Sequence, residues 1–145
     1  MPANPKITWP LMARAFVSLG AVLASLSVAL SSAAAHVPAL QQAGPVFTAS
    51  LVQHQFHALG LVLVGVLHAR FTSAWMVASG LLMVAGLLLF CLNIDARILW
   101  GWDSARSLVP VGGSAFILAW LAFAVGVLWP GKRPSLTPEA PASAR

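Results

Sequence analysis

Two histidines and two glutamines lie close together within one long apolar stretch of the sequence. Gln53, His54, Gln55 and His57 fall inside residues 47–69, which otherwise read as a membrane-spanning helix. Polar and ionisable side chains are costly in bilayer hydrocarbon, so each needs a partner inside the protein and marks a candidate functional site. Histidines three residues apart share one side of a helix, and imidazole is a common metal ligand. The pattern therefore indicates either metal chemistry or a polar contact between helices.

Other polar residues are expected to join this group at one end of the protein. His36 follows the first apolar stretch, and Asn93 and Asp95 follow the third, on the membrane face from which the second helix enters. The candidate metal ligands are His36, His54 and His57. The candidate structural polar cluster consists of Gln53, Gln55, Asn93 and Asp95.

Three roles for these residues are open. The preferred one is a hydrogen-bond network that ties the first three helices together. A metal site, or one haem held by His36 with His54 or His57, is the second, whereas two haems are disfavoured because the third and fourth apolar stretches contain no histidine. A proton or solute pathway is the third, but the second helix offers only Leu, Val, Gly and Ala between His57 and His68.

The composition defines the class of protein that must hold these side chains. Hydrophobic residues make up 59% of the 145 residues and charged residues only 8%, which does not suit the surface of a small soluble domain. A helix needs about 20 apolar residues to cross a hydrocarbon core, and continuous apolar runs exclude a β-barrel. The predicted spans are residues 15–35, 47–69, 74–92 and 108–129. We expect an all-α, integral membrane four-helix bundle over residues 11–129, with disordered tails at 1–10 and 130–145.

The distribution of charge predicts the orientation in the membrane. The net charge is +5, but the eight basic residues are scattered and form no patch of the kind that binds nucleic acid. Six of them fall on one face, namely Lys6, Arg14, Arg70, Lys132, Arg133 and Arg145. The other face carries Arg97 and Arg106, offset by Asp95 and Asp103. The positive-inside rule then places both termini in the cytoplasm, N-in and C-in.

The first apolar stretch has a competing interpretation as a secretory signal. Basic residues precede it, and alanines 33–35 fit a cleavage site that would leave His36 as a metal-chelating amino terminus. Its apolar part is about 20 residues long, however, which exceeds the usual 7 to 15 of a signal core. Its small residues also share one helical face, namely Gly20, Ala24, Ser27, Ser31 and Ala35. Such a face lets helices pack closely, so we expect the first helix to be retained.

A similar face of small residues runs along the fourth span. It is formed by Gly112, Ala115, Ala119, Ala122 and Gly126. This spacing predicts close packing of the fourth helix in a compact bundle. Helix-packing roles are expected of Gly112, Gly113 and Trp120.

The order of several motifs resembles that of a known family. The motifs are Ala35-His36, Gln55-Phe56-His57-Ala58-Leu59, Leu89-Phe90, and Pro110-Val111-Gly112-Gly113 followed by Phe116 and Trp120. Over about residues 11–129 the chain is similar to the small bacterial inner-membrane family called domain of unknown function 423, which is related to eukaryotic transmembrane protein 256. It departs from the family pattern at Ser31 and Ala34, at His54-Gln55 and over residues 90–95, and is a divergent member. The resemblance implies a four-helix membrane fold, and the family has no established activity.

No motif for catalysis is visible. The sequence contains no nucleotide-binding loop, paired-carboxylate site, Cys-x-x-Cys or nucleophile elbow, and it has only three acidic residues. We therefore expect a non-enzymatic structural or accessory membrane component, with no catalytic or cofactor-binding residues. Its expected partners are the lipid bilayer and either another membrane protein or a second copy of the chain. The alternative is a metal- or haem-binding redox accessory protein that uses the outer histidines.

Overall fold

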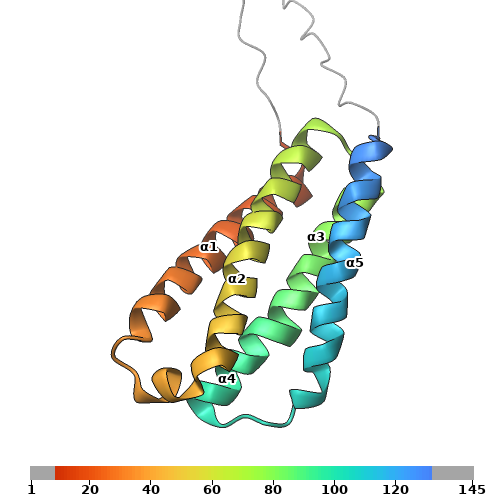
Figure 1. Ribbon diagram of the computed structural model, residues 1–145. Coiled ribbons are helices and arrows are strands. Elements are labelled where there is room, and N and C mark those ends of the chain that lie inside the picture. The colour runs from red at the N-terminus through yellow and green to blue at the C-terminus, as the bar shows by residue number, and fades with distance from the viewer. Residues whose placement is uncertain (1–8, 132–145) are drawn as a thin grey trace, which may run out of the picture.

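The computed structural model describes residues 9–131, and the predicted disordered tails lie outside this range except for their innermost residues. Every regular element in the described part is helical. Four helical segments run alternately down and up the long axis of the molecule, as Figure 1 shows, with short connections between them. The prediction of an all-α four-helix bundle is confirmed.

The first two helices form a close pair. α1 (Leu11–Ala33) packs mainly against α2 (Pro38–Arg70). A Cβ atom added at Gly20 of α1 or at Gly65 of α2 would lie 2.8 Å from a carbonyl oxygen of the other helix. No larger residue fits at either point without moving a backbone, so these two glycines set the distance between the helices.

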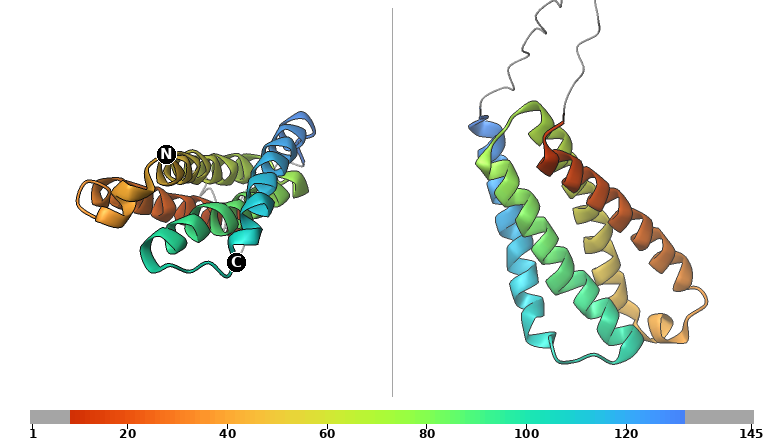
Figure 2. Two further views of the ribbon diagram at one scale, coloured as in Figure 1. Left: turned by 60° about the horizontal axis from the view of Figure 1, so that its bottom comes forward. Right: turned by 180° about the vertical axis from the view of Figure 1, so that it is seen from behind.

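The other end of α1 leans away from the bundle, as the two views in Figure 2 show. The predicted face of small residues on α1 follows this geometry, because Gly20 and Ser27 are buried whereas Ser31 and Ala35 are exposed. Only the first part of that face therefore contributes to packing.

α2 is interrupted near its start. Gly44 has φ 46° and ψ −117°, a conformation that favours glycine, and Pro45 follows it. Proline lacks a backbone N–H and is well suited to the first turn of a helix, so the spanning part of α2 begins again there. The helix thus starts before the predicted residue 47, but the residues ahead of Gly44 form a separate short turn at the end of the bundle (Figure 1).

The third segment is longer than predicted. It consists of α3 (Ala74–Gly86), a π-helical stretch η1 (Leu87–Leu92) and α4 (Asn93–Trp100) in one continuous run. The sequence suggested an end at residue 92 because polar residues follow, but these side chains find partners inside the protein and the helix continues. It ends at Gly101, whose φ of 69° is typical of the residue that terminates a helix.

The fourth segment completes the core. α5 (Val109–Leu128) follows a short 3-10 turn, η2 (Arg106–Leu108), and packs against α3 and η1. The small residues predicted to face the bundle are all buried, namely Gly112, Ala115, Ala119, Ala122 and Gly126. α2 and α5 both contact η1, and Leu61, Leu87 and Phe116 meet in the hydrophobic core between these elements.

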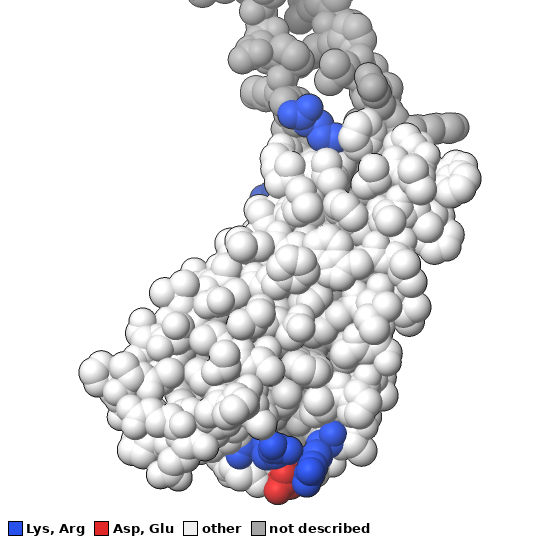
Figure 3. Space-filling model, in the orientation of Figure 1, with Lys and Arg blue, Asp and Glu red and all other residues white. Residues whose placement is uncertain are grey.

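The surface is that of a membrane-embedded protein. Four helical segments are long and apolar enough to cross a bilayer. The described charged side chains that reach the surface lie at the two ends of the bundle, and the long sides are uncharged on the face that Figure 3 shows. Arg14 and Arg70 lie at the end where residues 9 and 131 are found, and Arg97, Asp103 and Arg106 lie at the opposite end. The chain is therefore an integral, multi-pass membrane protein.

Candidate functional site

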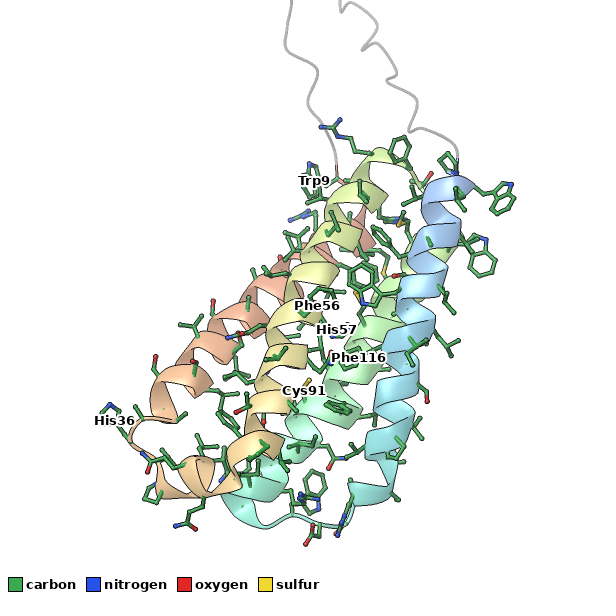
Figure 4. All side chains as sticks on the ribbon, in the orientation of Figure 1. Trp9, His36, Phe56, His57, Cys91 and Phe116 are labelled. Carbon is green, nitrogen blue, oxygen red and sulfur yellow. The ribbon has the colours of Figure 1, made fainter. Side chains whose placement is uncertain are left out.

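His57 is the histidine for which the structure provides the most partners. It lies on α2 with its side chain between α2 and α5, next to Phe116 (Figure 4), and it is only 3% exposed. Its Nδ1 lies 2.8 Å from the backbone carbonyl oxygen of Gln53, one turn earlier. The indole Nε1 of Trp120 donates a hydrogen bond of 3.1 Å to its Nε2. Both ring nitrogens are thus engaged.

These two contacts determine the state of the ring. An indole N–H can only donate, so Nε2 of His57 must be an acceptor without a proton. Nδ1 must then carry the proton that it donates to the Gln53 carbonyl. His57 is a neutral imidazole of fixed tautomer, and a metal could bind Nε2 only by displacing Trp120.

Aromatic rings hold His57 in this position. The Phe116 ring stacks on it with a centroid distance of 3.5 Å and an interplanar angle of 17°. Phe56 meets its edge at 5.3 Å and 85°, and Phe123 packs against Trp120 at 5.6 Å. These contacts join α2 and α5 through side chains where their backbones are apart. The sequence suggested Trp120 as a packing residue but gave no sign that it bonds to His57, although the spacing of Phe116 and Trp120 placed both on one face of α5.

His54 faces a different neighbour. It is fully buried, and the backbone of Leu23 on α1 interacts with its ring. Neither of its ring nitrogens reaches a partner in ordinary hydrogen-bond geometry among residues 9–131. The ring of His54 thus faces α1, whereas the ring of His57, three residues later on α2, faces α5.

The predicted metal site is not assembled. His36 is exposed in the connection after α1, at the edge of the molecule and far from His57 (Figure 4). Within residues 9–131 no group of three His, Cys, Asp or Glu side chains could hold a metal ion. The structure does not bring His36, His54 and His57 together, because α1 leans away from the bundle and the two α2 histidines face different helices. The same geometry separates the residues proposed as ligands of one haem.

A second polar cluster lies deeper toward the end that carries Arg97. The Ser50 hydroxyl is 2.9 Å from Oδ1 of Asp95 and 3.2 Å from the backbone carbonyl oxygen of Cys91, and these contacts join α2 to η1 and α4. Asp95 is only 4% exposed. Asp95 was expected to offset the charge of Arg97 at the surface. It faces the interior instead, because α4 continues the third span and turns this side chain toward α2.

Asn93 holds the connection that leads into α5. Its side-chain amide donates to the backbone carbonyl oxygen of Leu89 at 3.1 Å and to that of Ala105 at 2.7 Å. The predicted polar cluster is thus divided into separate parts: Asn93 and Asp95 bind different elements, and Gln55 makes no hydrogen bond with the other described residues. Gln53 contributes its backbone carbonyl oxygen to His57, and its side chain makes no hydrogen bond with the other described residues.

Beside His57 lies a groove that the sequence did not predict. It has a volume of about 390 Å³ and is lined by Gln53, Phe56, His57, Phe90, Gly113, Phe116, Ile117 and Trp120. The lining comes from α2, α5 and the π-helical η1, which provides Phe90. π-helical turns rotate the residues that follow and are frequent at functional sites. The two adjacent glycines of α5 therefore differ, since Gly112 packs on η1 whereas Gly113 lines the groove.

Comparison with known proteins identifies both a family and a relative of this chain. The model of the family described as protein of unknown function (DUF423) matches residues 30–113. The UPF0382 membrane protein YwdK of Bacillus subtilis (strain 168) is 31% identical over 121 residues, which cover 79% of this chain and 97% of that relative. No solved structure gives a significant match.

Proposed function

Because the chain belongs to the DUF423 family of unknown function, we propose that it is a non-enzymatic structural or accessory component of the bacterial inner (plasma) membrane. Three polar side chains join elements of the bundle, and this supports a structural role. His57 joins α2 to α5, Ser50 joins α2 to η1 and α4, and Asn93 fixes the connection before α5. Contacts of this kind stabilise a helical bundle in a membrane.

One observation carries this proposal. Both nitrogens of His57 are engaged with Gln53 and Trp120, and the ring is enclosed by aromatic side chains. A general base or a metal ligand needs a free nitrogen directed at its substrate or metal. A histidine whose donor and acceptor are both used within the protein serves as a link between helices.

The experiment that tests the proposal is an absorption spectrum and a metal analysis of the full chain purified in detergent. We expect no Soret band and metal contents well below one equivalent. The matched variants are His57→Gln and His36→Ala, since only the first residue lies in the bundle. A haem band or one equivalent of metal that disappears in His57→Gln but persists in His36→Ala would overturn the proposal in favour of a redox accessory role.

We also propose that both termini are cytoplasmic. Of the described basic residues, Arg14 and Arg70 lie at the end where the described chain begins and ends, and more basic residues fall in the adjoining tails. At the other end Asp103 lies 3.8 Å from Arg97, which reduces the positive charge there. The positive-inside rule supports this orientation. Reporter fusions at each terminus test it, and activity of a periplasmic reporter at either one would refute it.

Retention of α1 is part of the same proposal. The close crossing at Gly20 and Gly65 supports a helix that stays in the bundle, because a cleaved signal needs no such fit. Amino-terminal sequencing of the membrane-extracted protein tests this point. A mature chain that begins at His36 would refute it.

A further inference from the structure

The groove beside His57 opens toward the surrounding bilayer. Phe56 and Ile117, on its two rims, are 57% and 66% exposed, whereas its inner wall is formed by His57 and Phe116, which are buried. The lining between Gly113 and Trp120 extends for about 10 Å along α5 at 1.5 Å per residue. The groove is therefore short, lined by aromatic side chains and open along the side of the bundle.

One polar side chain in this groove has no partner. Gln53 is half-buried and lines the groove, and its amide makes no hydrogen bond with any of residues 9–131. Gln53 lies seventeen residues before Arg70, a distance of about 25 Å along a helix. With Arg70 at one edge of a hydrocarbon core of about 30 Å, Gln53 lies near the opposite edge, where the acyl chains meet the polar headgroup region.

Basic side chains lie beyond this edge. Arg97 of α4 and Arg106 of η2 lie at the end of the molecule opposite the termini, where Figure 3 shows basic side chains. Asp103 lies 3.8 Å from Arg97, whereas Arg106 is exposed and makes no ion pair with another residue in the range 9–131. From the membrane interior to its surface, the groove is thus followed by the Gln53 amide and then by the Arg106 guanidinium.

We propose that the groove binds one acyl chain of an anionic phospholipid in the leaflet opposite the chain termini. In this arrangement the Gln53 amide donates a hydrogen bond to an ester carbonyl oxygen of the lipid, and Arg106 attracts its phosphate. The proposal depends on the membrane-embedded fold and not on the accessory role. Metal or haem in the purified protein would therefore defeat the proposed function and leave the lipid site standing.

The size of the groove favours a lipid chain over a partner helix. A helix about 10 Å wide occupies roughly 800 Å³ over a length of 10 Å, which is about twice the 390 Å³ of the groove. A second copy of the chain could thus not seat a helix in it without opening α2 and α5.

Native mass spectrometry of the detergent-purified full chain tests the proposal. Phosphatidylglycerol and phosphatidylcholine with identical acyl chains are added in parallel, and we expect phosphatidylglycerol to bind as a single equivalent at least about tenfold more tightly. Gly113→Leu fills the groove and should weaken both lipids. Arg106→Gln should reduce the preference for phosphatidylglycerol, and Gln53→Leu should weaken both. Val111→Leu is the matched control, because Val111 is exposed on α5 outside the groove.

Folding of the variants can be checked separately. A Cβ at Gly113 lies no closer than 3.8 Å to the Phe90 ring, so Gly113→Leu should keep the circular dichroism spectrum of the wild type. Equal binding of both lipids, or binding unchanged by Gly113→Leu in the folded variant, would overturn the proposal. A wild-type dimer that Gly113→Leu converts to a monomer would also overturn it, in favour of self-association through the groove.

Discussion

Adding one methyl group at either of two adjacent glycines of α5 should have opposite effects on stability. A Cβ at Gly112 would lie 2.6 Å from the backbone nitrogen of Phe90 and 2.9 Å from the backbone carbonyl carbon of Leu89. These are backbone atoms of η1, so no side-chain rotation can relieve the contact. A Cβ at Gly113 would meet only the Phe90 ring, at 3.8 Å, which is ordinary van der Waals contact.

The expected magnitudes follow from these distances. Replacing glycine by alanine within a helix contributes about 1 kcal/mol in favour of folding, and overpacking a core costs typically about 1–3 kcal/mol. Gly112→Ala must separate α5 from η1 and should lower the free energy of unfolding by up to about 2 kcal/mol. Gly113→Ala has no clash to offset its gain and should raise it by up to about 1 kcal/mol.

The assay is unfolding of the two variants by SDS in mixed micelles, followed by far-UV circular dichroism under identical lipid and detergent conditions. The comparison is internal because the same methyl group is added at neighbouring positions of the same helix. If Gly112→Ala is as stable as Gly113→Ala, or more stable, then α5 does not approach η1 as closely as described and the reasoning fails.

Three further predictions use the same assay. A double-mutant cycle of Trp120→Phe and His57→Phe should give a coupling energy of about 0.6–1.7 kcal/mol, from the average to the maximum found for hydrogen bonds between membrane helices. A coupling energy of zero would show that Trp120 and His57 do not form this hydrogen bond. Ser50→Ala should lower the free energy of unfolding by about 1–3 kcal/mol because it leaves the buried Asp95 carboxyl without its hydroxyl partner. Asp95→Asn keeps a group that can bond to Ser50 and should cost less. A larger loss of stability in Asp95→Asn than in Ser50→Ala would contradict this. His54→Leu should raise the free energy of unfolding by about 1 kcal/mol, since neither ring nitrogen makes a hydrogen bond of good geometry with any of residues 9–131 and burial of the ring outweighs its interaction with the backbone of Leu23. A loss of stability would show that the interaction with Leu23 stabilises the protein.

The sequence predicted the class of fold and much of the packing. Long apolar runs and spaced small residues depend only on local composition, and they correctly indicated four helices and the buried face of α5 that includes Gly112 and Ala119. The end of the third helix was predicted too early, because Asn93 and Asp95 look like the end of a span until their partners, Ala105 and Ser50, are known.

The candidate site was predicted less completely. Helical spacing correctly directed His57 into the bundle, but it could not show that His54 faces α1 while His57 faces α5. The expected cluster with His36 failed because it assumed that residues at one end of the bundle are close together. α1 packs closely on α2 at Gly20 and Gly65, but its other end leans away from the bundle.

By itself, the sequence determined that this chain is an integral membrane protein of four helices, because the cost of burying polar groups in hydrocarbon leaves few alternatives for so apolar a chain. Only the tertiary structure decided which polar groups meet. The hydrogen bond between Trp120 and His57, for example, joins two residues that are 63 positions apart in the chain and depends on the rotation and distance of their helices. The π-helical turn in η1 was also visible only in the tertiary structure. It brings Phe90 to the groove between α2 and α5, and that groove exists only because these two helices both pack on a third segment and not closely on each other.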